Sequence, residues 1–385
     1  MEILLTSTDN PYTTYQGGKH IHLLLLEKGL ENLGIQVATL YYIKKSAKER
    51  IKRYALVLLT EKRRNEIKLG WMISYLQSHI PHENFDIIHS HDVLSMLAVR
   101  SMPQKKVLTL HGYFARENIE FIRNKRDRDA VYPHLLQLEK DGMKNADRII
   151  AVDRRLKDYA ISEFSYPADR ITVMHNAVDT DTFSPVSEDE QKELKKSLGF
   201  APDDFVVLVP RRLVEKNGVI YAVHAMESTR DSKVKMIIAG DGPERERIMK
   251  EAEEDKRIHL AGMAPHDKIS SFFKMANVIL IPSITSHGIQ EATSLAMLEG
   301  MSCGKAVVCS DIGGMHEVIK NMENGLLVKE KEPEAIATAI ETIISNPGLS
   351  SRIGDEARKH VLQNHSYTAH AAKVAQIYRS IIGET

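Results

Sequence analysis

The chain alternates between short apolar runs and stretches of helical spacing, and this pattern restricts its fold more than any other feature. In the first half the apolar runs lie at 3–7, 35–42, 85–89, 107–110, 148–152 and 171–174. Such runs, bounded by turn residues, are typical of strands buried on both faces. Strands separated by helices pair in parallel through right-handed crossovers. We therefore predict an α/β fold with a doubly wound parallel sheet.

A turn-rich connector divides the chain into two such halves. The alternation lapses around residues 176–198 and returns with apolar runs at 205–209, 234–239, 258–260 and 278–281. We place one Rossmann-like domain at 1–183 and a second at 184–366, and we expect a C-terminal helix at about 367–385 to pack back on the first. Ligands of such folds bind beyond the carboxyl ends of the strands, which predicts a site in a cleft between two sheets that face each other.

Composition narrows the class of protein. The 52 basic and 52 acidic side chains balance, so composition does not indicate nucleic acid as the main partner. Cys303 and Cys309 are too few for a disulfide framework and lie in apolar surroundings, which indicates buried thiols in a reducing compartment. No apolar run approaches the roughly 20 residues that span a bilayer. We expect a cytoplasmic protein.

The stretch from Asn277 to Val308 carries the clearest functional pattern. It is predicted to form a strand that ends at Pro282, a polar loop, a helix that Thr293 or Ser294 can cap, and a second strand. Two carboxylates lie in this unit, Glu291 before the helix and Glu299 eight residues later. In an arbitrary chain, two solvated helix glutamates would be the commoner explanation.

Distances argue against a hydrolytic role for Glu291 and Glu299. If the segment between them is helical, eight residues rise roughly 12 Å. The two carboxylates of a glycosidase lie about 5–5.5 Å apart in retaining enzymes and about 6.5–9.5 Å apart in inverting ones. The pair is better placed to bind two ends of one elongated ligand. Because it flanks a helix N-terminus, an anionic group such as a diphosphate would suit that ligand.

The residues from Glu291 to Val308 resemble the E-x7-E motif of the family-4 retaining glycosyltransferases of GT-B fold, and the resemblance covers nearly the whole chain. It implies that Glu291 contacts the donor hexose and Glu299 the ribose hydroxyls of a nucleotide sugar. The amides of Leu295 and Ala296 would then meet the diphosphate. The sequence departs from the family at 292–294, where Ala-Thr-Ser stands in place of Gly-Phe-Gly, and this concerns the shape of the loop.

A basic cluster resembles the family's G-R-L-x-x-x-K-G segment. Without a metal, an arginine and a lysine must stabilise the charge of a diphosphate leaving group. The resemblance assigns these roles to Arg212 and Lys216, with Arg211 as a substitute. The usual spacing of five from Arg212 falls on Asn217. Taken alone, such a cluster is more often a solvated surface feature.

Two further positions depend on the resemblance. Gly17 and Gly18 resemble the glycine loop in which the backbone approaches the donor phosphate or the acceptor. His111, at the end of an apolar run, matches a family histidine near the donor sugar. Taken alone, a glycine pair is commonly a turn, and a histidine there commonly ends a strand.

We expect no metal site. The string His89-Ser-His91-Asp92 suggests metal ligands, but we set it aside on the argument that neighbouring histidines on a strand point to opposite faces. The family also carries a similar histidine pair at this place.

The implied function is metal-independent transfer of a hexose, with retention, from a nucleotide-diphosphate sugar to an acceptor hydroxyl. A UDP-sugar is favoured as donor and no cofactor is expected. The donor is assigned to the domain at 184–366 and the acceptor, a small molecule, a saccharide or a lipid-linked compound, to the domain at 1–183. Alternatives are a nucleotide-sugar epimerase or phosphorylase of the same fold, or a non-catalytic nucleotide-sugar binding module.

Two segments have a composition that would suit contact with a membrane surface. Residues 44–64 and 122–126 mix basic and apolar side chains. A helix of this composition can lie on an anionic membrane, which would suit a lipid-linked acceptor at the inner face. A solvated basic surface explains the same composition and is the commoner case.

Overall fold

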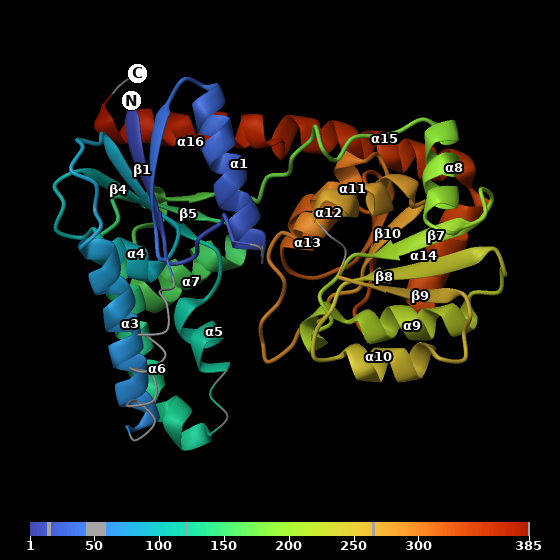
Figure 1. Ribbon diagram of the computed structural model, residues 1–385, viewed down its shortest axis with the longest axis horizontal. Coiled ribbons are helices and arrows are strands. Elements are labelled where there is room, and N and C mark those ends of the chain that lie inside the picture. Colours follow the sequence, from blue (N-terminus) through green and yellow to red (C-terminus); the bar gives the residue numbers. More distant parts are fainter. Residues whose placement is uncertain (14–16, 44–58, 121, 123, 264–265, 384–385) are drawn as a thin grey trace. The chain divides into compact units, whose positions relative to one another are not determined.

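The computed structural model spans residues 1–385 and describes all of them except 14–16, 44–58, 121, 123, 264–265 and 384–385. The chain forms two compact units, one made of 1–175 with 370–385 and the other of 176–369. Each has its own parallel sheet and its own cores (Figure 1). The α/β class with two doubly wound sheets is confirmed.

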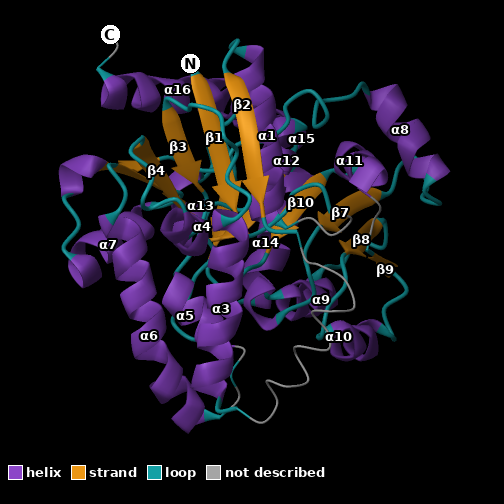
Figure 2. Cartoon of the chain, turned by 60° about the vertical axis from the view of Figure 1, so that its left-hand side comes forward, coloured by secondary structure: helices purple, strands orange, loops and turns teal. Residues whose placement is uncertain are grey.

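The first unit is built on a six-stranded parallel sheet in the order β2-β1-β3-β4-β5-β6. Its strands are β1 (Glu2–Ser7), β2 (Gln36–Tyr41), β3 (Ile87–Ser90), β4 (Lys105–Leu110), β5 (Arg148–Ala151) and β6 (Ile171–Val173). Figure 2 shows β2, β1, β3 and β4 side by side. The strand order reverses between β1 and β3, and the carboxyl edge at such a reversal is where doubly wound sheets bind ligands.

The first unit also contains helices, some of which pack on its sheet. They are α1 (Gly18–Asn32), α3 (Glu61–Gln77), α4 (Val93–Ala98), α5 (Phe114–Glu120), α6 (Lys125–Lys144), α7 (Arg154–Phe164), the 3-10 turn η2 (Ala168–Arg170) and α16 (Tyr367–Ile382). In one core, Leu26 of α1 and Val374 of α16 pack against Ile87 of β3. A second core joins α3, α4, α5 and α6, which Figure 1 shows away from α1 and α16.

The second unit repeats this design with the strand order β12-β11-β10-β7-β8-β9. Its strands are β7 (Phe205–Val209), β8 (Val234–Ala239), β9 (Ile258–Gly262), β10 (Val278–Ile281), β11 (Ala306–Ser310) and β12 (Leu326–Val328). The strand order reverses between β7 and β10, which are parallel neighbours although far apart in the chain. The loops that follow these two strands therefore flank the expected binding position.

Two cores cover the two faces of the second sheet. Side chains alternate along a strand, so Val207 and Val209 of β7 enter one core, while Val206 and Leu208 enter the other. The helices of this unit are α8 (Glu188–Ser197), η3 (Glu215–Asn217), α9 (Val219–Ser228), α10 (Arg245–Ala252), α11 (His266–Met275), α12 (Leu295–Ser302), α13 (Gly313–Val318), α14 (Pro333–Ser345) and α15 (Pro347–Asn364). Of these, α9, α10 and α14 contribute to the first core, and α11, α12, α13 and α15 to the second.

The units divide between His175 and Asn176, whereas the sequence placed the junction between 183 and 184. The connector belongs with the second unit because Val178 and Phe183 are buried in its core, and Val178 also forms an isolated bridge with Ser366. The chain returns to the first unit within α16.

Candidate functional site

A buried arginine organises the carboxyl edge of the second sheet. Arg211 follows β7 and is only 8% exposed. Its guanidinium forms an ion pair with the carboxylate of Glu291 and donates to Asn217 Oδ1 at 2.6 Å. It also donates to the hydroxyls of Ser283 at 3.0 Å and Ser294 at 3.1 Å. The loops after β7 and β10 are therefore joined through one side chain, at the reversal of the strand order.

Close backbone contacts join the loop after β7 to the loops after β10 and β8. A Cβ on Gly218 would lie 1.9 Å from the carbonyl oxygen of Pro282, and Gly218 has a φ of +61°. A Cβ on Gly240 would lie 1.9 Å from the carbonyl oxygen of Arg211. Only glycine fits at such distances, and at Gly218 the positive φ favours it as well. These contacts fix the direction in which Arg211 leaves the backbone.

The two carboxylates of the E-x7-E pattern have opposite electrostatic environments. Burial acts to raise the pKa of Glu291, but the charges of Arg211 and Lys216 bring it below its usual value. Glu291 is therefore ionised at neutral pH. Burial raises the pKa of Glu299 to about 7. The carboxyl group of Glu299 thus lacks the compensation that Arg211 gives to Glu291.

Helix α12 begins four residues after Glu291. Ser294 caps it by accepting a hydrogen bond from the backbone N–H of Met297 at 3.4 Å, as the sequence predicts for this position. Leu295 and Ala296 occupy the first turn, where backbone N–H groups lack acceptors within the helix and favour an anion. Residues 291–294 are not helical, so the rise of a continuous helix does not give the separation of Glu291 and Glu299.

The basic residues assigned from the sequence are arranged unequally. Arg211 and Asn217 are buried beside Glu291, whereas the side chains of Arg212 and Lys216 are exposed. Ser283 contacts both Arg211 and Glu291, and the sequence argument did not single it out. Its position, directly after the proline that follows β10, was the available signal.

Histidines gather at the carboxyl edge of the first sheet. Gly17 caps α1 and donates its backbone N–H to His20 Nδ1 at 3.2 Å, and Gly18 begins the helix. His111 follows β4, and its Nε2 lies 3.3 Å from Nδ1 of His91, which follows β3. The ring of His22, on α1, lies 4.6 Å from the ring of His111 between centroids. The structure thus brings His111 together with His91 and His22, a grouping that the sequence did not indicate.

Burial dominates the electrostatics of this histidine group. It lowers the pKa of His91 and of His111 well below the usual value, and the neighbouring rings lower both further. Lys19 lies beside the group between two carboxylates, 2.7 Å from Asp9 and 3.2 Å from Asp92. The imidazoles of His91 and His111 are therefore neutral at physiological pH, and the adjacent lysine is paired with two carboxylates.

His89 and His91 do not point to opposite faces, contrary to the expectation from the sequence. The two residues are two positions apart, so their side chains share a face, and their ring centroids lie 4.2 Å apart. His89 is satisfied within the protein, with its nitrogens 2.7 Å from the hydroxyls of Tyr378 and Thr109. Only His91 of the pair lies beside His111 in a hydrogen-bonding contact.

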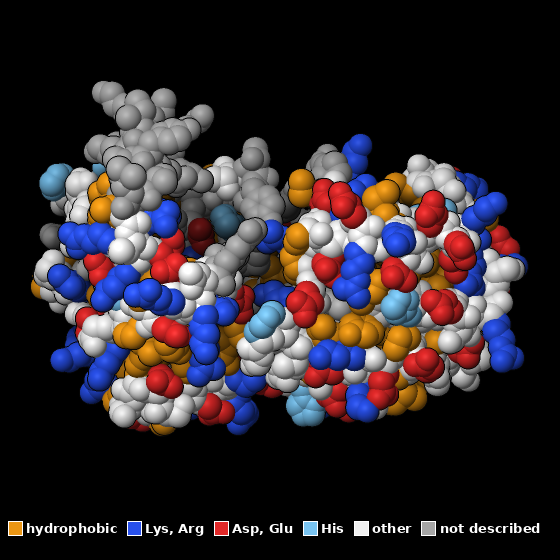
Figure 3. All heavy atoms as spheres, turned by 90° about the horizontal axis from the view of Figure 1, so that it is seen from below, with side chains coloured by type: hydrophobic (Ala, Val, Ile, Leu, Met, Phe, Trp, Pro, Cys, Tyr) orange, Lys and Arg blue, Asp and Glu red, His pale blue; other side chains and the backbone are white. Residues whose placement is uncertain are grey.

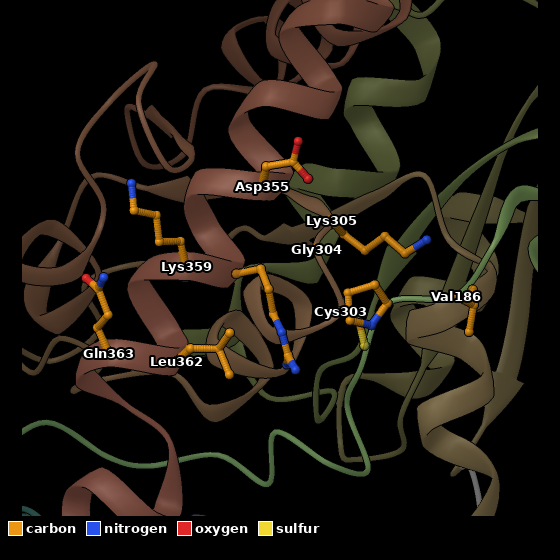
Figure 4. A pocket seen from close by; sticks show the side chains of 10 residues that line it. Val186, Cys303, Gly304, Lys305, Asp355, Lys359, Leu362 and Gln363 are labelled. Atoms are coloured by element: carbon orange, nitrogen blue, oxygen red, sulfur yellow. The ribbon is translucent and has the colours of Figure 1, made fainter.

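A hollow of about 500 Å³ in the second unit lies at the C-terminal end of α12 (Figure 4). Lys305, Asp355 and Lys359 line it. Arg358 also lines it, but its guanidinium donates to backbone carbonyls of the connector and of α12 and so has a structural role. Burial lowers the pKa of Lys305 to about 8. The two cysteines are buried free thiols, as expected.

One face of the second unit carries charges of both signs. Figure 3 shows basic and acidic side chains intermixed over the face of the second unit that it presents. The proposed membrane segment at 44–64 lies largely outside the described residues, since 44–58 are not described. In the part of the chain that is described, no helix is long and apolar enough to cross a membrane.

Two doubly wound units, each with polar side chains at the strand-order reversal, define the class of GT-B folds. Sucrose-phosphate synthase from Thermosynechococcus elongatus has this fold with a TM-score of 0.78, 19% identity and coverage of 99% of both chains. An Anabaena protein, HepE, solved in complex with UDP-glucose, matches with a TM-score of 0.74 and 19% identity over 99% of this chain and all of that one.

Family models identify the chain more closely. Residues 16–182 match the model described as Glycosyltransferase Family 4, and residues 190–360 match Glycosyl transferases group 1. Together the two matches cover most of the chain, which therefore belongs to the glycosyltransferases that these models describe.

Curated relatives support the same assignment. An uncharacterized glycosyltransferase of Methanocaldococcus jannaschii is 28% identical over 237 residues, and the match covers 60% of each chain. The alpha-maltose-1-phosphate synthase of Mycolicibacterium smegmatis is 25% identical over 262 residues, 63% of this chain and 66% of that one. A putative glycosyltransferase of Bacillus subtilis, EpsD, is 27% identical over 306 residues, 76% of each. The chain therefore spans about three fifths to two thirds of the length of the first two relatives.

Proposed function

We propose that the protein transfers a hexose, with retention and without a metal, from a nucleotide-diphosphate sugar to an acceptor hydroxyl. The observation that carries this proposal is the buried contact of Arg211 with Glu291 at the strand-order reversal beside the start of α12. A diphosphate there would meet the guanidinium of Arg211 and the first-turn amides of Leu295 and Ala296.

Each group in the second unit has a part in this reaction. Glu291, held ionised by Arg211, orients the sugar by accepting hydrogen bonds from its hydroxyls. The carboxyl group of Glu299 has no compensating charge and accepts from the ribose hydroxyls. Lys216 and Arg212 are exposed and can close on the phosphates. Charge that develops on the leaving diphosphate is thus stabilised by fixed donors rather than by a metal.

The proposed chemical step needs no strong base from the protein. The bond from C1 of the sugar to the diphosphate oxygen breaks while the acceptor oxygen bonds to C1 on the same face. The acceptor proton passes to the departing phosphate oxygen. The protein contributes orientation and charge stabilisation, and His111 of the first unit is proposed to contact the donor sugar.

We favour a UDP-sugar as donor. Support comes from HepE, which has the same fold and was solved with UDP-glucose. The acceptor is assigned to the first unit, whose Gly17 and Gly18 open α1 at the carboxyl edge of the sheet. As acceptor, a saccharide or a lipid-linked compound is consistent with the family. Peripheral contact with the inner face of a membrane would suit a lipid-linked acceptor.

A product assay with defined donors tests the proposal. The protein is incubated with UDP-glucose, UDP-N-acetylglucosamine, ADP-glucose or GDP-mannose and a panel of acceptors, with and without EDTA. Release of nucleoside diphosphate and the anomeric proton coupling of the product are measured by NMR. The expected product has the same anomeric configuration as the donor, at a rate that EDTA does not change. An inverted product, or loss of activity in EDTA that Mg²⁺ restores, would contradict the mechanism.

A further inference from the structure

Three histidines from three different elements converge at the carboxyl edge of the first sheet. His22 lies on α1, His91 follows β3 and His111 follows β4. One side-chain nitrogen of each lies within 4.8 Å of the corresponding nitrogens of the other two. His22 and His91 are almost fully buried, at 2% and 1% exposure. Since the three come from distant parts of the sequence, only the fold assembles them.

The spacing within this histidine group suits a bound ion. Two nitrogen ligands on a tetrahedral Zn²⁺, each about 2.0–2.1 Å from the ion, lie roughly 3.3–3.4 Å apart. The separation of His91 Nδ1 and His111 Nε2 is 3.3 Å. A direct hydrogen bond between the two rings explains this distance too. His22 must approach by a small side-chain rotation, because its nitrogen is at the wider spacing of up to 4.8 Å.

The protein does not use all the hydrogen-bonding capacity of this group. His91 Nε2 is buried and has no hydrogen-bond partner among the described residues. A buried polar atom without a partner is costly, and it commonly marks a site for a water or an ion. The 3.3 Å contact with His111 uses Nδ1 of His91, so the unpartnered Nε2 is a second nitrogen of the same ring, which a water or an ion could take up after a ring flip.

The positive charge next to the histidine group is partly neutralised. Lys19 is the nearby basic side chain, and it lies between the carboxylates of Asp9 and Asp92 at 2.7 and 3.2 Å. The carboxylate of Asp92 also accepts hydrogen bonds from the backbone N–H groups of Thr8 and Ser95. Asp9 and Asp92 thus offset part of the positive charge of Lys19, which still lowers the pKa of His91 and of His111.

We propose that His22, His91 and His111 bind a divalent transition-metal ion, with Zn²⁺ as the reference ion. Three imidazoles leave one position of a tetrahedral ion open for water or an anion. Because His111 is assigned to the donor sugar, a bound ion would withdraw it and slow transfer; this consequence rests on the proposed function. The ion is a regulatory ligand here and takes no part in the transfer step.

Cobalt spectroscopy tests binding directly on the full chain. Metal-free protein is titrated with Co²⁺, whose tetrahedral complexes absorb strongly in the visible range, and the signal is then displaced by Zn²⁺. We expect one site per chain with a tetrahedral spectrum. His22→Gln and His91→Gln should each weaken Co²⁺ binding at least about tenfold. His79→Gln is the matched control, since His79 is an exposed histidine of the same unit.

Every outcome of this titration decides for or against the site. A wild-type spectrum of octahedral type, or binding that neither His22→Gln nor His91→Gln weakens relative to His79→Gln, would overturn the proposal. The test on the wild-type spectrum does not depend on whether any variant folds. Circular dichroism checks that the two variants are folded. Binding is read without any transfer assay, so failure of the metal site and failure of the proposed transferase activity are distinguishable. Inhibition of sugar transfer by Zn²⁺ in the wild type but not in His22→Gln would link the metal site to the transferase activity.

Discussion

Arg211 is buried and Glu291 is half-buried, and they form an ion pair, so neither charge can be removed without affecting its partner. Glu291→Ala leaves the guanidinium of Arg211 buried with only neutral acceptors. We expect the free energy of unfolding to fall by about 3 kcal/mol. Urea denaturation at pH 7 measures it.

A double variant provides the control for this pair. Replacing both charges by apolar residues, Arg211→Met with Glu291→Leu, removes the unpaired charge and should cost less than Glu291→Ala alone. A cost below about 1 kcal/mol for Glu291→Ala would show that the pair is not buried as described.

Glu299 predicts a pH dependence of nucleotide binding. Its pKa is raised to about 7, so its carboxyl group loses its charge as the pH falls through 7. If the ionised form accepts from the ribose, the affinity for UDP should fall as the pH is lowered from 8 to 5.5, approaching tenfold per unit below the pKa. Isothermal titration calorimetry measures the affinity.

Glu299→Gln is the matched control, because it keeps the size of the side chain and cannot titrate. The variant should bind UDP more weakly at pH 8 and show a flat profile. A wild-type profile as flat as that of the variant would remove Glu299 from nucleotide binding.

Lys305 predicts a pH dependence of stability. Burial lowers its pKa to about 8, so between pH 8 and 10.5 the folded chain binds fewer protons at this site than the unfolded chain. Its contribution to the free energy of unfolding is therefore least favourable below pH 8 and improves as the pH rises to 10.5. Lys305→Met should be more stable than wild type at pH 7, by about 1–2 kcal/mol after allowance for solvent screening.

The difference between Lys305→Met and wild type should shrink as the pH rises from 8 to 10.5. Thermal melts in matched buffers measure it, and Lys359→Met, at an exposed lysine of the same hollow, is the control. A difference that is constant with pH would assign the effect to packing instead of charge.

Helix α16 contributes both apolar surface and a polar contact to the first unit. Tyr378 is fully buried, packs with Ile87 and Val107, and its hydroxyl lies 2.7 Å from His89 Nδ1. Tyr378→Ala should lower the free energy of unfolding by about 4 kcal/mol, because it leaves a large cavity. Tyr378→Phe keeps the ring and should cost about 1 kcal/mol for the lost hydrogen bond.

Chemical denaturation of the two Tyr378 variants separates packing from hydrogen bonding. Equal costs for both would mean that the contact with His89 outweighs the packing of the ring. Near-zero costs for both would mean that α16 is not part of the core of the first unit.

Single elements were well predicted where the signal was local. The strand at 278–281 and the cap at Ser294 follow from an apolar run ending at proline and a hydroxyl before a helical pattern, and the structure agrees with both. The separation of Glu291 and Glu299 was not predictable in this way. It depends on the loop at 291–294, whose path is set by contacts with other loops, such as the hydrogen bond from Gly314 to the carbonyl of Glu291.

The chain as a whole has two separate sets of cores. Each hydrophobic cluster of the described residues lies within one unit. We therefore expect two calorimetric transitions, of which UDP raises only the one that belongs to the second unit, where the proposed nucleotide site lies.

Tyr378→Ala identifies which transition belongs to which unit, because it should lower the melting temperature of the first unit. A single transition that responds to both UDP and Tyr378→Ala would show that the units unfold together. A UDP shift in the transition that Tyr378→Ala lowers would assign the nucleotide to the first unit.

At the level of the whole chain, the local pattern of the amino acids was enough to indicate two doubly wound sheets and the residues of the E-x7-E unit. Periodicity and turn residues act over short stretches, so they can be interpreted without the fold. Which of Arg211 and Arg212 lies beside Glu291 could not be predicted in this way. It depends on the direction of a loop that backbone contacts at Gly218 and Gly240 fix from outside that loop.

The histidine group shows the same limit. His22, His91 and His111 are distant in the sequence, and a parallel sheet brings its strand ends and helix starts to one edge only after folding. The pKa of Glu299 likewise depends on burial by residues from elsewhere in the chain. Local patterns thus determined which elements form, and packing between distant segments decided which side chains meet and with what charge.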